Sequence, residues 1–134
     1  RGGRGDVTES HTAWVREVGA LPDVASPVSN GALVFTVSSG GGLSCFDAVS
    51  GERLWTHGIG GRTYVSPSLV GDRLLLFTRE GRAMVMAAEE KPRVLGEASL
   101  GKLKMSASPA FARVAGKPRM FLRTEGQLLC IGAP

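Results

Sequence analysis

Residues 45–55 read CFDAVSGERLW, so an apolar segment, a polar turn and a second apolar segment follow one another in a short space. Both apolar segments are too short for independent helices and are rich in residues that suit strands. Gly51 supplies turn geometry that residues with a Cβ resist. The stretch therefore predicts two β-strands joined by a tight turn, and similar patterns elsewhere in the chain point to internal repeats.

Two sets of landmarks define the repeat. Ser-Pro pairs recur at spacings of 40 and 42 residues, at Ser26-Pro27, Ser66-Pro67 and Ser108-Pro109. Large apolar residues recur at spacings of 41 and 40 residues, at Trp14, Trp55 and Leu95. Proline cannot donate to a ladder of hydrogen bonds and is tolerated where a strand begins, so each Ser-Pro pair is expected to open a unit.

Within each unit the pattern is one of short strands separated by turn residues. The clearest strands are expected at 33–37, 43–46, 52–56, 74–78, 83–86, 93–97, 120–124 and 128–131. Four antiparallel strands in about forty residues have the dimension of a propeller blade, whereas a β-helix has fewer strands per turn. The sequence therefore predicts an all-β fold, a β-propeller of four-stranded antiparallel blades, with about three blades in this chain.

The repeat also divides residues 1–134 of this single partial propeller into parts. We expect residues 1–19 to hold the outer strand of a shared blade, residues 20–60 and 61–101 to form two whole blades, and residues 102–134 to supply the first three strands of another shared blade. An unpaired outer strand at one end complements a missing one at the other. Strands from outside the chain, from a second copy or from further blades of a longer parent, are therefore expected to close the ring.

Residues 45–55 resemble the repeat of the PQQ-like (pyrroloquinoline quinone) β-propeller family in its bacterial, non-catalytic form. The shared features are an apolar strand, Asp-Ala, a Ser-Gly turn and a Trp four residues after the Gly. The second unit departs from this pattern, with Ala87-Ala88 in place of Asp-Ala and Leu95 in place of Trp. The resemblance implies blades that dock through tryptophans. In enzymatic members it also implies PQQ, calcium, a catalytic carboxylate and adjacent cysteines.

The residues themselves suggest no catalytic, cofactor-binding or metal site. Cys45 and Cys130 are 85 residues apart at equivalent strand positions, so we expect two buried, unbonded strand cysteines. The sole asparagine, Asn30, lies beside a hairpin glycine and not in an oxygen-rich cluster suited to a hard cation. His11 and His57 lack companion ligands and are expected near edge strands, facing solvent. No catalytic residue, metal or cofactor is therefore predicted.

Charge and hydropathy limit the partners. The net charge of +4 comes from basic residues interleaved with acids, which is typical of solvated surface and not of a nucleic-acid interface. No apolar run approaches the length of a membrane span. We therefore expect a non-enzymatic scaffold that binds a protein, peptide or saccharide. The family resemblance adds a bacterial envelope location, periplasmic or secreted. The alternative is a fragment of a quinoprotein dehydrogenase, or of another propeller enzyme, with its active residues outside this chain.

Overall fold

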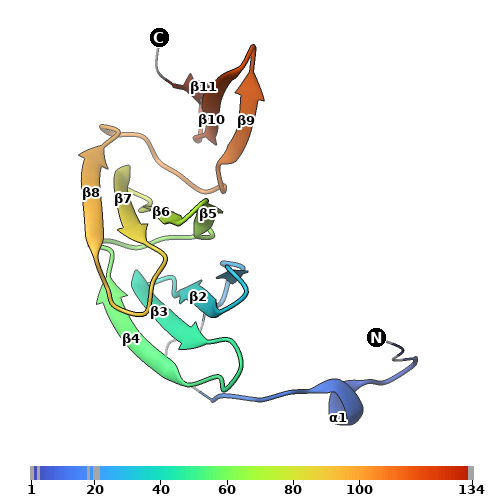
Figure 1. Cartoon of the computed structure of the whole chain (residues 1–134). Coiled ribbons are helices and arrows are strands. Elements are labelled where there is room, and N and C mark those ends of the chain that lie inside the picture. Colours follow the sequence, from blue (N-terminus) through green and yellow to red (C-terminus); the bar gives the residue numbers. More distant parts are fainter. Residues whose placement is uncertain (1, 3, 18, 20–21, 133–134) are drawn as a thin grey trace.

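A computed structural model describes residues 2, 4–17, 19 and 22–132. Three antiparallel sheets follow one another along an arc (Figure 1). The first contains β1 (Val28–Ser29), β2 (Leu33–Val37), β3 (Gly42–Asp47) and β4 (Arg53–Gly58). The second contains β5 (Ser68–Val70), β6 (Arg73–Phe77), β7 (Arg82–Ala87) and β8 (Val94–Ser99). The third contains only β9 (Ala110–Val114), β10 (Lys117–Arg123) and β11 (Leu128–Ile131).

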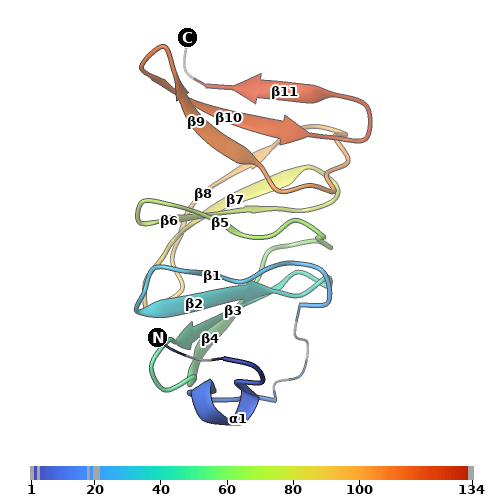
Figure 2. The same cartoon turned by 90° about the vertical axis from the view of Figure 1, so that its right-hand side faces the viewer.

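Each sheet is a meander in which consecutive strands pair. Phe35 of β2 lies opposite Cys45 of β3, and Phe121 of β10 lies opposite Cys130 of β11 in the same way, so the units share one register. Figure 2 shows the three sheets stacked face to face along the arc. The predicted all-β class and four-stranded blades are confirmed, with the third sheet lacking its outer strand.

The core lies between the sheets. In β2, side chains alternate so that Leu33, Phe35 and Val37 are buried, as the period of a strand requires. Together with Trp55 of β4 they pack against buried side chains of β6 and β7 in the second sheet. A smaller cluster, which includes Leu122 of β10, joins the second sheet to the third. Burial of one sheet on the next therefore holds the arc together.

The N-terminal segment differs from the prediction in its details. A short helix, α1 (Thr8–His11), stands away from the sheets, and the Asp6 carboxylate accepts a 2.9 Å hydrogen bond from the Thr8 N–H. Residues 12–17 extend from it without pairing in a ladder, and residue 18 lies outside the described residues. The outer strand expected in this region stays a prediction, because its ladder partner would belong to a preceding blade.

Candidate functional site

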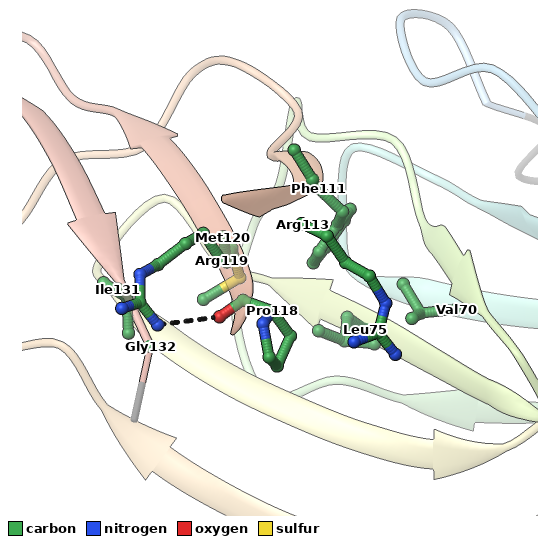
Figure 3. Close-up of a pocket in the computed structure, with 10 residues that line it drawn as sticks. Val70, Leu75, Phe111, Arg113, Pro118, Arg119, Met120, Ile131 and Gly132 are labelled. Atoms are coloured by element: carbon green, nitrogen blue, oxygen red, sulfur yellow. Dashed lines mark hydrogen bonds between the residues drawn. The ribbon is translucent and has the colours of Figure 1, made fainter. Parts of the chain in front are cut away.

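The best-defined hollow is a cleft of about 540 Å³ between the second and third sheets (Figure 3). It opens where the core between these sheets reaches solvent. The lining residues are Val70, Leu75, Phe111, Ala112, Arg113, Pro118, Arg119, Met120, Ile131 and Gly132. Five strands and the hairpin between β9 and β10 therefore contribute to one site.

The walls of the cleft are apolar. Val70 at the end of β5 and Leu75 of β6 form one side, and Phe111 of β9 and Met120 of β10 belong to the other. Leu75 and Met120 also pack on the core between the sheets, so they anchor the floor. Val70 is 41% exposed and Phe111 37% exposed, which leaves apolar surface open to a ligand.

Two arginines flank the apolar walls. Arg113 Nη1 donates a 3.1 Å hydrogen bond to the Gly116 carbonyl oxygen, and Arg119 Nη1 donates one of the same length to the Pro118 carbonyl oxygen (Figure 3). A guanidinium carries five N–H donors, so Arg113 keeps donors for a further acceptor. No acidic side chain is among the described residues that line the cleft. The arrangement suits an apolar group with a carboxylate beside it.

The structure separates the two cysteines singled out in the sequence. Cys45 of β3 is fully buried, and burial, followed by the nearby charge of Glu90, raises the pKa of its thiol to about 12. Cys130 is exposed, so the prediction that it is buried is wrong. The reason is that β11 pairs only with β10 and lies at the open edge of the third sheet. Both cysteines are free and they lie in different sheets.

The remaining candidates also lie apart. His11 ends α1, where its Nδ1 is 2.7 Å from the Ser10 hydroxyl, so its expected place near an edge strand is wrong. His57 does lie on the edge strand β4 but is half-buried. Asn30 uses its side chain locally, since its Oδ1 accepts the Leu33 N–H at 2.8 Å. Across the described part of the chain, no group of three or more His, Cys, Asp or Glu residues could hold a metal ion.

The residues present do not fit PQQ with calcium. The cofactor arrangement implied by the enzymatic members needs carboxylates gathered around a hard cation and two adjacent cysteines. Here the cysteines belong to β3 and β11, and the Asn30 amide is engaged in its own hairpin and with the Ala88 carbonyl oxygen. No step of chemistry is therefore derived through that cofactor.

Comparison with known proteins gives the fold. No family model and no curated protein sequence matches the chain. Among solved structures, BamB from Moraxella catarrhalis superposes with a TM-score of 0.69 at 18% identity, over 90% of this chain and 36% of that one. The chain has a β-propeller fold. A europium-containing methanol dehydrogenase superposes with a TM-score of 0.63 at 11% identity, over 91% of this chain and 27% of that one.

The likenesses support a propeller of the PQQ-repeat type and extend to the fold alone. One of the two similar proteins is a dehydrogenase and BamB is a propeller without catalytic activity, so the shared architecture serves both classes. The chain spans about a third of BamB and about a quarter of the dehydrogenase. Within the described residues, no helix is long and apolar enough to cross a membrane.

Sequence reasoning missed the cleft. Its walls come from two repeats, and none of the residues belongs to a motif. A weak signal was available in Phe111, an aromatic residue in the otherwise small and polar opening strand of the third unit. Its exposure depends on how the third sheet sits on the second, which local sequence does not encode.

Proposed function

We propose that this chain is part of a non-enzymatic propeller scaffold that binds a protein or peptide partner in the cleft between its second and third sheets. The observation that carries the proposal is the cleft itself, which combines apolar walls with Arg113 and Arg119. Its lining offers few polar groups for the many hydroxyls of a saccharide, so an apolar peptide side chain is the better match. The resemblance to PQQ-like repeats supports a place in the bacterial envelope, periplasmic or secreted.

The partner that suits this cleft is an extended peptide with an apolar side chain next to an acidic residue. The apolar side chain would rest between Val70 and Phe111, and the acidic residue would accept hydrogen bonds from Arg113. A rigid floor formed by Leu75 and Met120 would limit the entropy lost on binding.

The experiment is selection from a random peptide phage library on the immobilised chain, followed by calorimetry with a selected synthetic peptide. Phe111→Ala and Arg113→Gln are expected to weaken binding about tenfold or more, since interface aromatics and arginines dominate affinity. Val49→Ala, 85% exposed in the β3–β4 turn, serves as the matched control and should bind like the wild type. Selection that enriches no peptide, or peptides indifferent to both cleft variants, would contradict the proposal.

The enzyme alternative is tested in parallel. Addition of PQQ with calcium chloride to the folded chain should leave the cofactor's absorbance spectrum unchanged, because no suitable donor set exists among the described residues. A saturable spectral change would favour the quinoprotein reading over the scaffold.

A further inference from the structure

The segment around Trp14 occupies the place of an outer blade strand. Its indole Nε1 donates a 3.0 Å hydrogen bond to the Ala48 carbonyl oxygen, 34 residues further on. Trp55 of β4, which is such an outer strand, donates to the Glu89 carbonyl oxygen across the same separation of 34 residues. Gly51 completes the first contact, because a Cβ added there would lie 2.6 Å from the Trp14 ring. Trp14 therefore docks on the first sheet as Trp55 docks on the second.

Arginine 16 strengthens this docking. Its Nε donates to the Gly51 carbonyl oxygen at 3.2 Å and its Nη2 to the Ser50 carbonyl oxygen at 3.0 Å. Three hydrogen bonds thus hold residues 14 and 16 against the β3–β4 turn. The segment is placed like a strand of a preceding blade although it has no ladder partner in this chain.

A second relationship also runs from sheet to sheet. The Ser26 N–H donates to the Ser66 hydroxyl at 2.9 Å, and the Ser66 N–H donates to the Ser108 hydroxyl at 3.1 Å. Continuation of this series beyond the third sheet requires a hydroxyl equivalent to that of Ser66 as acceptor for the Ser108 N–H. Ser26 of another copy presents such a hydroxyl at the head of the arc.

The far end of the arc is open in a complementary way. The strand β11 pairs with β10 alone, so one of its edges lacks a neighbour in the sheet. Leu128 on this strand is 75% exposed and Ile131 is 36% exposed. An unpaired strand edge with exposed apolar residues is a template for strand addition.

We infer that β11 pairs with residues 14–16 of a second copy of this chain, so that two arcs close head to tail. The inference rests on the propeller assembly proposed above but not on the cleft or its ligand. The register follows from the first sheet, where Cys45 lies opposite Trp55 and Ser44 opposite Thr56. Since Cys130 takes the place of Cys45, Cys130 faces Trp14 of the other copy and Leu129 faces Val15 of the other copy.

This register predicts which residues cross-link. In a Cys130→Ser background, the pair Val15→Cys and Leu129→Cys should form an intermolecular disulfide under mild oxidation, because opposed strand residues have Cβ atoms about 4.5–5.5 Å apart. The pair Val15→Cys and Leu128→Cys is the matched control, since adjacent strand residues point to opposite faces. Residue 15 and β11 lie at opposite ends of the arc, so a bond within one chain cannot mimic the result (Figure 1).

Solution mass gives an independent readout. Light scattering of the wild type should give twice the chain mass of 14.0 kDa. Leu128→Lys should raise the dissociation constant of the dimer at least tenfold, because a charge on an edge strand opposes pairing. Val49→Lys introduces the same charge at a site that is 85% exposed and should leave the mass unchanged.

Two results would overturn the inference: a wild-type mass of one chain at all concentrations, or equal cross-linking of the matched and control cysteine pairs. Neither result bears on the scaffold proposal, because peptide binding in the cleft is measured separately. Conversely, a dimer that binds no selected peptide would support the closure and reject the cleft as a binding site.

Discussion

The indole Nε1 of Trp55 donates a 3.2 Å hydrogen bond to the carbonyl oxygen of Glu89 in the adjacent sheet. The same side chain is 9% exposed, and its ring centroid lies 6.0 Å from that of Phe35 at an interplanar angle of 50°. This geometry lets one residue fill the core between two sheets and satisfy its single polar group. Trp55 thus holds the first sheet against the second.

Truncation of Trp55 should be strongly destabilising. Trp55→Ala removes a buried aromatic ring and is expected to lower the free energy of unfolding by about 3–5 kcal/mol. Trp55→Phe keeps an aromatic ring but loses the hydrogen bond to Glu89, so it should fall between the two. Urea denaturation followed by circular dichroism measures both, with Val49→Ala as control. A loss below about 1 kcal/mol for Trp55→Ala would mean that the ring acts as a surface residue.

Gly41 and Gly31 form a matched pair that separates backbone strain from close packing. Both have positive φ, of 87° and 95°, so alanine at either should cost about 1–2 kcal/mol of stability through strain alone. At Gly41 a Cβ would also lie 2.0 Å from the Gly61 carbonyl oxygen, whereas nothing lies within 4 Å at Gly31. Gly41→Ala should therefore be clearly more destabilising than Gly31→Ala in thermal melts. Equal losses would show that the approach of Gly61 is relaxed at no cost.

The Asp47 turn should make stability depend on acid pH. The Asp47 Oδ1 accepts hydrogen bonds from the Ser50 N–H at 2.7 Å and the Val49 N–H at 3.0 Å. The bond from the Ser50 backbone is the main cause that lowers the pKa of Asp47 below its ordinary value of 3.8. The folded state thus favours the carboxylate, and its contribution is present above the ordinary pKa and lost as pH falls through the lowered one.

Asp47→Ala is expected to be less stable than the wild type at pH 7, and the difference should shrink as the pH falls below about 4. Asp47→Asn should be milder at pH 7, since its side-chain oxygen still accepts the turn N–H groups. Urea midpoints at a series of pH values measure this. Asp72→Ala is the control, because that carboxylate is 94% exposed and has only a 3.7 Å contact with Arg73. A constant difference between wild type and Asp47→Ala across the range would contradict the role given to the carboxylate.

The repeat was predictable because it is encoded locally. Alternating apolar residues and turn glycines gave the strand at 33–37 with its observed limits. The equivalence of Trp14 and Trp55 foretold two sheet-to-sheet contacts that the hydrogen bonds to Ala48 and Glu89 confirm. Such features repeat with the chain, so one well-conforming unit predicts the others.

Features that depend on neighbouring sheets could not be predicted. Cys130 matches Cys45 in sequence, yet it is exposed because its strand is the last of the sheet. The short helix at Thr8–His11 has no periodic apolar face to announce it. The cleft around Phe111 arises where two units meet, and neither unit alone contains both of its walls.

Cys45 provides a test of the core between the first two sheets. Its side chain is fully buried, and burial is the main cause that raises the pKa of its thiol from an ordinary value of 9.0 to about 12. Since the thiolate is the nucleophile, a thiol that is both covered and protonated should be inert. In Cys130→Ser protein, Ellman's reagent at pH 8 should find no reactive thiol until denaturant is added, and one thiol per chain afterwards.

The same shift has a consequence at alkaline pH. Between pH 9 and about 12 the unfolded thiol has lost its proton while the folded thiol keeps it, so the unfolded state binds fewer protons and stability falls as pH rises. Cys45→Ala in the Cys130→Ser background should show a shallower fall over this range. Its absolute stability will be lower because a small cavity forms, so the slope against pH is the quantity to compare. Rapid reaction of Cys45 without denaturant, or identical slopes in the two proteins, would show that this thiol is not sealed within the core.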